Sequence, residues 1–202
     1  MKTPQKIQDF LNRIPFNFEE KGEFYSSPAV ALKENKAQCL EGALIAALAL
    51  EIHGHKPLLL DLKTVADRDE DHVVALFKVD GCWGAISKTN HAVLRYREPI
   101  YKSVRELALS YFHEYFLPSG EKTLRSFSEP FDLSKTKINW KDSNKNLKDL
   151  VKMLDKSPHT QILSKKQIKN LRRADKIEIK AGEIRAELPS KVQKSVSRRI
   201  RG

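Results

Sequence analysis

A largely apolar segment from Gln38 to Ile52 constrains the fold more than any other feature of this chain. It is rich in Ala and Leu and is apolar on nearly every face of a helix. A helix that is apolar all round is buried, so the other elements must pack around this one. Its longest uninterrupted apolar run, Ala43–Leu50, is too short to span a bilayer. No apolar leader precedes it, and we expect a soluble, cytoplasmic protein with no membrane partner.

The segments that follow this helix predict a small antiparallel sheet. Two β-rich runs, His72–Val79 and Cys82–Ser87, flank an Asp80-Gly81 pair, which is the typical turn of a two-residue hairpin. Apolar residues at Pro57–Leu62 and Val93–Tyr96 predict two further strands.

Further helices are expected around these strands. Apolar residues at helical spacing indicate one helix from Ile7 to Ile14 and another from Ser103 to Tyr115. Ser27-Pro28 is a cap followed by a proline, which begins a short helix. The order predicts an α+β fold, in which a small antiparallel sheet packs on the central buried helix with Cys39 at its N-terminus.

The charge divides the chain at Ser134. Residues 1–134 contain 17 Lys and Arg against 19 Asp and Glu, whereas residues 135–202 contain 20 against 7. We therefore predict a core over residues 1–134 and a basic, partly helical C-terminal extension over residues 135–202. The excess indicates either a polyanionic partner, such as nucleic acid bound nonspecifically, or a solvated surface. The extension contains two short helical patterns and an end expected to fray, at Asn146–Leu154, Ser164–Ala174 and after Pro189.

Cys39 is the candidate nucleophile. Unpaired N–H groups and the helix dipole favour a thiolate at a helix N-terminus, and the same N–H groups can hold an oxyanion. The alternative is a small buried hydrophobic residue. The other cysteine is Cys82, and neither has a cysteine or histidine partner at metal-ligand spacing. We therefore expect no zinc site, and no cofactor is implied.

His72 is the candidate base because it opens a strand that can face the helix. Its acidic neighbours Asp69, Glu70 and Asp71 would favour an imidazolium, and thus a thiolate–imidazolium pair. The alternative is a histidine that only makes salt bridges to this acidic loop.

The third residue of such a site is an acceptor that orients the histidine ring. With a two-residue turn at Asp80-Gly81, His72 pairs near Thr89 and shares a face with Ser87 and Thr89, neither of which is a carboxylate. Asn90 lies one position further and would reach the ring if the strand carried a bulge. We expect Asn90 to take this role.

Two pairs of short segments carry a resemblance to a known family. Ser27–Leu32 followed by Ala37–Ala43, and Asp71–Leu76 followed by Asp80–Gly84, stand in matching order and spacing. They resemble the transglutaminase-like, papain-like cysteine enzymes, in which a cysteine opens the central helix and a histidine opens a strand. The resemblance covers Pro28–Asn90.

The resemblance implies a papain-like core with a Cys-His-Asp triad and protease, amidase, acyltransferase or transglutaminase activity. The aspartate of the family aligns nearest Ser87, so either Asn90 substitutes for it or this chain is weakly active or inactive. We expect a cysteine-dependent acyl-transfer enzyme acting on a peptide, amide or thioester, by hydrolysis or transfer. The alternative is a non-catalytic protein that binds nucleic acid or an acidic partner through residues 135–202.

Overall fold

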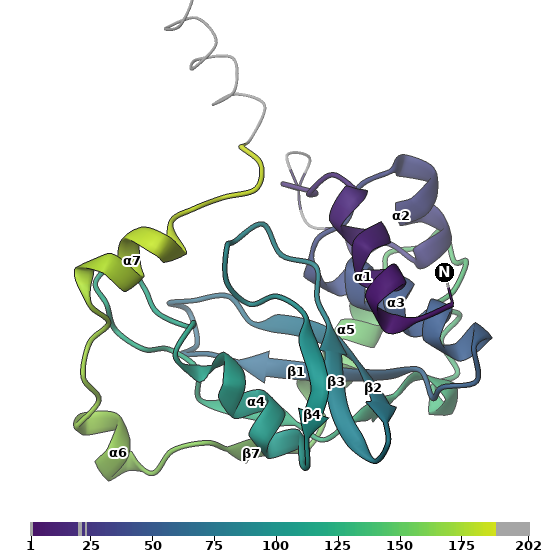
Figure 1. Cartoon of the computed structure of the whole chain (residues 1–202). Coiled ribbons are helices and arrows are strands. Elements are labelled where there is room, and N and C mark those ends of the chain that lie inside the picture. Colours follow the sequence, from purple (N-terminus) through teal and green to yellow (C-terminus); the bar gives the residue numbers. More distant parts are fainter. Residues whose placement is uncertain (1, 20–21, 23, 189–202) are drawn as a thin grey trace, which may run out of the picture.

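Helices cover both faces of a single antiparallel sheet in the computed structural model, which describes residues 2–19, 22 and 24–188 (Figure 1). The strand order is β4-β3-β2-β1-β5-β7, with β6 also paired to β1. The strands are β1 (Leu58–Lys63), β2 (His72–Val79), β3 (Cys82–Ile86), β4 (Arg97–Tyr101), β5 (Ser126–Ser128), β6 (Phe131–Asp132) and β7 (His159–Gln161). The helices are α1 (Pro4–Arg13), α2 (Pro28–Glu34), α3 (Cys39–Ile52), α4 (Val104–Phe112), the 3-10 turn η1 (Leu133–Lys135), α5 (Lys148–Asp155), α6 (Lys165–Lys169) and α7 (Lys176–Gly182).

Strands β2 and β3 form a hairpin within the sheet, and its prediction is confirmed. Val79 pairs with Cys82 across a two-residue turn, and both Asp80 and Gly81 have positive φ, at 49° and 78°. A turn with two positive φ values matches the twist of the flanking strands, which explains the Asp-Gly pair. The register then runs without interruption to Ala75 opposite Ile86.

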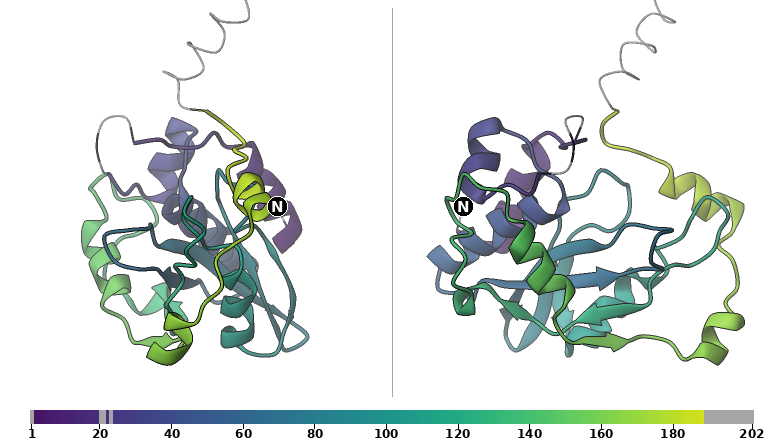
Figure 2. Two further views of the ribbon diagram at one scale, coloured as in Figure 1. Left: turned by 90° about the vertical axis from the view of Figure 1, so that its left-hand side faces the viewer. Right: turned by 180° about the vertical axis from the view of Figure 1, so that it is seen from behind.

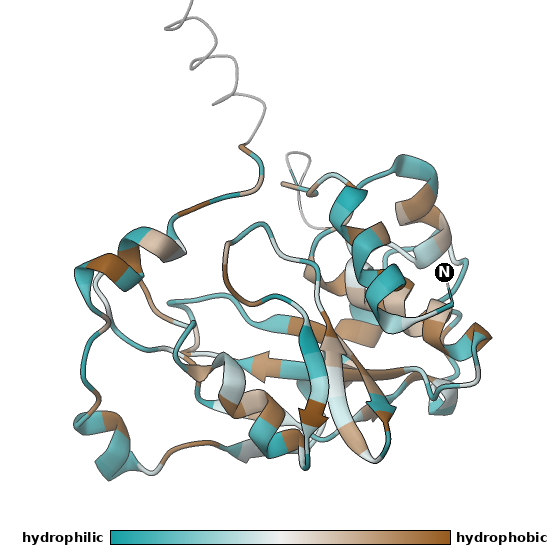
Figure 3. Cartoon of the chain, in the orientation of Figure 1, coloured by the Kyte–Doolittle hydropathy of each residue, from teal (hydrophilic) through white to brown (hydrophobic). Residues whose placement is uncertain are grey.

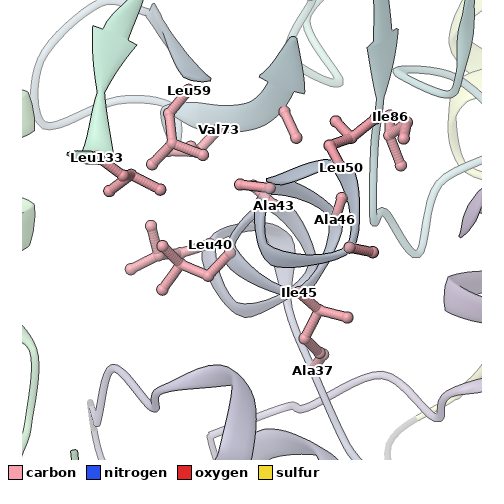
Figure 4. Close-up of a cluster of buried hydrophobic side chains, with 14 of the residues drawn as sticks. Ala37, Leu40, Ala43, Ile45, Ala46, Leu50, Leu59, Val73, Ile86 and Leu133 are labelled. Atoms are coloured by element: carbon pink, nitrogen blue, oxygen red, sulfur yellow. The ribbon is translucent and has the colours of Figure 1, made fainter. Parts of the chain in front are cut away.

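Helix α3 is buried against one face of this sheet, as its all-round apolar sequence predicts. Figure 4 shows Ala43 and Leu50 of the helix facing Leu59, Val73 and Ile86 of three neighbouring strands. The helix begins where it does because the Glu41 carboxylate accepts the backbone N–H of Gln38 at 3.1 Å, which caps the first turn.

Glycine is required at position 42 because α3 touches the loop after β3. A Cβ at Gly42 would lie 2.2 Å from the Cβ of Lys88. The Lys88 side chain is itself buried and donates to the carbonyls of Leu11 and Ile14 at the end of α1. This close approach fixes the loop against the first turn of the helix.

The opposite face of the sheet packs against α4. Alternate residues of β1 and β2, among them Leu60, Leu62, Val74 and Leu76, share a buried cluster with Leu107 and Tyr111 of this helix. Figure 3 shows the brown, apolar positions on the strands between the two helical layers. The prediction of an α+β fold with a small antiparallel sheet is therefore confirmed at the level of class.

Some predicted elements differ in extent. The strand expected at Val93–Tyr96 lies later, at β4, because side chains bond the loop before it: Glu114 accepts from the N–H of Leu94, and Ser87 donates to its carbonyl. The helix expected at Ser103–Tyr115 is shorter. The helix expected at Ser164–Ala174 is shorter and comprises only α6. Ala174 donates its N–H to Gly120 instead of continuing a helix, and α7 begins after it.

The charge boundary at Ser134 does not separate two structural units. Strand β7 pairs with β5, so the sheet continues past the boundary. Leu147, Leu150 and Leu154, on and before α5, are at most 3% exposed and belong to the cluster around α3. The basic composition of this part of the chain describes its surface, and its apolar residues complete the core.

The last described segment, residues 170–188, returns along one edge of the molecule. Figure 2 shows α7 and the chain after it lying beside the loops at one end of the sheet. The N–H of Ala92 donates to Ile184 at 3.1 Å, and that of Ala186 to Asn90 at 2.8 Å.

The fraying expected after Pro189 concerns residues outside the described part. Within that part, every helix is too short or too polar to cross a membrane.

Candidate functional site

Cys39 is the first residue of α3, as the sequence predicts, and it remains partly exposed. Backbone N–H groups of Val73 and Leu40 face its sulfur and lower the pKa of the thiol. Burial outweighs them and raises this pKa to about 12, with Glu41 and Glu70 adding to the rise. The resting group is therefore a neutral thiol.

His72 is 5% exposed and lies at the first position of β2. Burial is the largest cause that lowers its pKa to about 4; the neighbouring His91 and Arg97 add to this, and a hydrogen bond to the Leu94 backbone opposes it. The ring is therefore neutral near pH 7. The thiolate–imidazolium pair expected from the sequence is opposed by the direction of both pKa shifts, because burial disfavours each charged form.

Asp69 and Asp71, two of the acidic residues before His72, bond to other groups. Asp71 accepts the backbone N–H and the hydroxyl of Thr64 at 2.8 and 3.1 Å, and Asp69 accepts the hydroxyl of Thr123. These carboxylates are not among the groups that shift the pKa of the His72 imidazole.

The partner of the histidine ring is Ser87, which lies 2.8 Å from the Nε2 atom of His72. Continuing the register of β2 and β3 places Thr89 opposite His72 and Ser87 diagonally across from it on the same face. Ser87 follows β3 directly and is 1% exposed, so the contact is shielded from water.

The hydrogen bonds of Ser87 determine which ring nitrogen carries the proton. The Ser87 hydroxyl donates to the carbonyl of Leu94 at 2.6 Å. Because a carbonyl only accepts, the hydroxyl hydrogen is used there, and the serine oxygen accepts from His72 Nε2. With this assignment the neutral His72 ring carries its hydrogen on Nε2 and a lone pair on Nδ1. The backbone of Leu94 also lies beside the ring.

Asn90 does not orient the ring. Its side-chain amide donates to the carbonyl of Glu187 at 3.0 Å and accepts the N–H of the same residue at 2.8 Å. Side chains alternate between the two faces of an extended chain. Because β2 and β3 pair without a bulge, position 90 points to the face opposite that of Ser87. Asn90 instead anchors the C-terminal segment.

Gln8 of α1 holds the backbone of Ser87 in place, which sequence reasoning missed. Its amide donates to the Ser87 carbonyl at 2.8 Å and accepts the Ser87 N–H at 2.9 Å. A buried glutamine on the apolar side of an amphipathic helix, here 7% exposed, is the sequence signal that could have indicated it.

Cys39 and His72 both line one cavity of about 390 Å³. Alternation along β2 puts His72 on the face of Val74 and Leu76, which packs against α4, whereas α3 packs against the other face, so the two side chains approach the cavity from opposite faces of the sheet. The loops before β2 and after β3 contribute Glu70, Thr89 and His91, and the C-terminal segment closes one side with Gly182 and Arg185. The cavity therefore combines the helix N-terminus, the strand that carries the base, and the end of the described chain.

Cys39 also lines a second cavity, of about 310 Å³, which is acidic. Its carboxylates include Asp61, Asp71 and Asp155, whose oxygens lie within 4.8 Å of one another and could hold a metal ion. Burial and then Asp71 raise the pKa of Asp61 to about 6. Each has a protein partner: His159 lies 3.2 Å from Asp61, Thr64 bonds Asp71, and Lys63 pairs with Asp155.

Comparison with models of known protein families and with curated proteins found no match to this chain.

Proposed function

We propose that the chain is a cysteine-dependent acyl-transfer enzyme, with Cys39 as nucleophile, His72 as general base and Ser87 as the residue that orients the base. The observation that carries the proposal is the arrangement around the histidine. Its Nε2–H is fixed by a buried hydroxyl while Nδ1 keeps a lone pair, in a cavity that also contains the Cys39 thiol.

The neutral resting state defines the first step. As the Cys39 sulfur attacks the carbonyl carbon of an amide or thioester, its proton passes to His72 Nδ1, and the carbonyl π electrons move to the oxygen. The oxyanion then re-forms the carbonyl as the bond to the amine or thiol breaks. The leaving group takes the proton from His72, which leaves an acyl group on Cys39.

The second step releases the acyl group. His72 removes a proton from water or an incoming amine as it attacks the thioester, and the Cys39 sulfur leaves and regains the proton. Water gives hydrolysis, and an amine gives transfer. We propose that the chain is a member of the transglutaminase-like superfamily, with serine in place of its aspartate. The order of cysteine helix, histidine strand and following strand supports this.

Mass spectrometry after reaction with p-nitrophenyl acetate tests the proposal. We expect one acetyl group on Cys39, none on Cys82, and at least a tenfold slower reaction in His72→Ala. Cys82, which is also partly exposed, is the internal control. Equal, slow modification of both cysteines would contradict the proposal.

A second candidate is favoured by the charge of residues 135–202, which contain 20 Lys and Arg against 7 Asp and Glu. We propose that this surface binds polyanions nonspecifically, through counterion release and without base recognition. Binding of heparin that weakens steeply as salt rises is the expected observation.

A further inference from the structure

The hydroxyl of Tyr115 lacks a hydrogen-bond partner although it is buried. Within residues 2–19, 22 and 24–188, the buried side-chain oxygens in this condition belong to Tyr96 and Tyr115. Glu98 lies near the Tyr96 hydroxyl and raises its pKa after burial does, so Tyr96 has an acceptor in its surroundings. Phenylalanine would pack as well as Tyr115 without the cost of burying an unpaired hydroxyl.

Tyr115 is held in a fixed position. It follows α4, is 4% exposed, and belongs to the cluster between α4 and the sheet. Its carbonyl accepts the backbone N–H of Thr123 at 3.1 Å, and Phe116 pairs with Lys122 in the next bridge. These contacts fix the backbone of Tyr115 and bury its ring.

The side chain borders the reaction site. Tyr115 lines the same cavity of about 390 Å³ as Cys39 and His72. Burial is the largest cause that raises the pKa of Tyr115, and electrostatic interaction with Cys39, Asp69 and Asp71 adds to the rise. The phenol is therefore a protonated donor in the cavity that contains the thiol. The two carboxylates are already bonded to Thr123 and Thr64.

We propose that Tyr115 donates its hydroxyl hydrogen to the carbonyl oxygen of the acyl group that Cys39 attacks, and that it stabilises the oxyanion formed there. This inference rests on the proposed function. A site with a neutral thiol needs such a donor, because the thiol proton passes to His72 while negative charge develops on the carbonyl oxygen. The phenol keeps its own proton throughout.

The test compares two reagents on the full chain at one pH. p-Nitrophenyl acetate forms a tetrahedral oxyanion at Cys39, whereas methyl methanethiosulfonate reacts at sulfur and forms no oxyanion. In Tyr115→Phe, acetylation of Cys39 should slow by about 10²-fold, while thiolation of Cys39 should keep its wild-type rate. The melting temperature should be unchanged or higher, since the lost hydroxyl has no partner.

Tyr96→Phe is the matched control, because Tyr96 lines neither cavity and its ring stacks on Phe77 with centroids 5.9 Å apart. It should acetylate like the wild type. Unchanged acetylation in Tyr115→Phe, or an equal loss with both reagents, would overturn the inference and leave the proposed function standing. A wild-type Cys39 that thiolates but never acetylates would instead overturn the proposed function and the inference with it.

Discussion

At the scale of single residues, Ser87 decides how His72 can act. It accepts the Nε2–H of the ring, but as a neutral group it does not stabilise an imidazolium as an aspartate would. We predict that Ser87→Ala slows acetylation of Cys39 by about 10²-fold, because the ring loses the contact that fixes Nδ1 as the base.

Thr89→Ala is the matched control for this change, since Thr89 shares the face of Ser87 while its hydroxyl accepts the N–H of His91 at 3.0 Å. The kinetics of p-nitrophenol release, measured for both variants, separate the two positions. A Ser87→Ala variant as fast as Thr89→Ala would remove Ser87 from the site.

Burial of His72 also makes stability depend on pH. Its pKa is about 4 in the folded chain, below the ordinary value of about 6.5. Between these values the unfolded chain binds more protons, so the free energy of unfolding falls as the pH falls from 6.5 to 4. The loss from this residue amounts to at most about 3 kcal/mol.

Asp61 opposes this trend, because its pKa is raised to about 6 and folding then favours its protonated form. Urea unfolding of the wild type and of His72→Gln, compared across pH 4–7, cancels the contribution of Asp61. We expect the difference between their free energies of unfolding to shrink toward acid pH. A difference that stays constant would show that His72 titrates normally in the folded chain.

At the scale of elements, α1 is part of the site although it lies outside the hairpin and α3. Gln8→Ala removes both bonds to the Ser87 backbone. We predict a loss of about 2 kcal/mol in the free energy of unfolding, because a buried N–H and carbonyl are left unpaired, and acetylation of Cys39 slowed by about tenfold.

Gln5→Ala on the same helix is the control, since Gln5 is exposed and should change neither quantity. Chemical unfolding and p-nitrophenol release give the two measurements. If Gln8→Ala lost stability alone, the clamp would support the fold without positioning Ser87.

The elements that could be predicted are those specified by local sequence. The all-apolar pattern of α3 and the Asp80-Gly81 turn indicate their structures directly, and the register that follows from the turn places Ser87 and Thr89 on the face of His72. The position of Ser87 as ring partner depends instead on Gln8 and Leu94, which come from a distant helix and an irregular loop. No local pattern encodes those contacts.

At the scale of the whole molecule, the change in charge at Ser134 does not coincide with a boundary of the hydrophobic core, which includes residues on both sides. We predict that a shortened chain ending at Ser134 lacks a cooperative unfolding transition. It loses β7 and the buried Leu147, Leu150 and Leu154, each of which contributes about 2 kcal/mol by burial. The composition of this region misled the sequence-based division because Lys-rich helices still bury one apolar face.

A chain ending at Leu188 is the companion variant. It keeps every described element and removes five Lys and Arg residues. We expect it to unfold like the full chain in a thermal melt and to bind heparin with a smaller dependence on salt. Equal binding by both chains would place the polyanion surface within residues 135–188, and no binding by either would exclude the second candidate function.

The anchoring of the C-terminal segment by Asn90 has a consequence for how the protein matures during synthesis. One wall of the cavity consists of Gly182 and Arg185, and the carboxylate of Glu187 accepts the N–H of Phe16 at 2.9 Å. Phe16 and Glu187 are separated by 171 positions in the sequence. A nascent chain can assemble the hairpin and α3 early, but it cannot enclose its thiol until residues 182–187 have left the ribosome. Cys39 is therefore least shielded from cellular thiols and electrophiles while the chain is still being made.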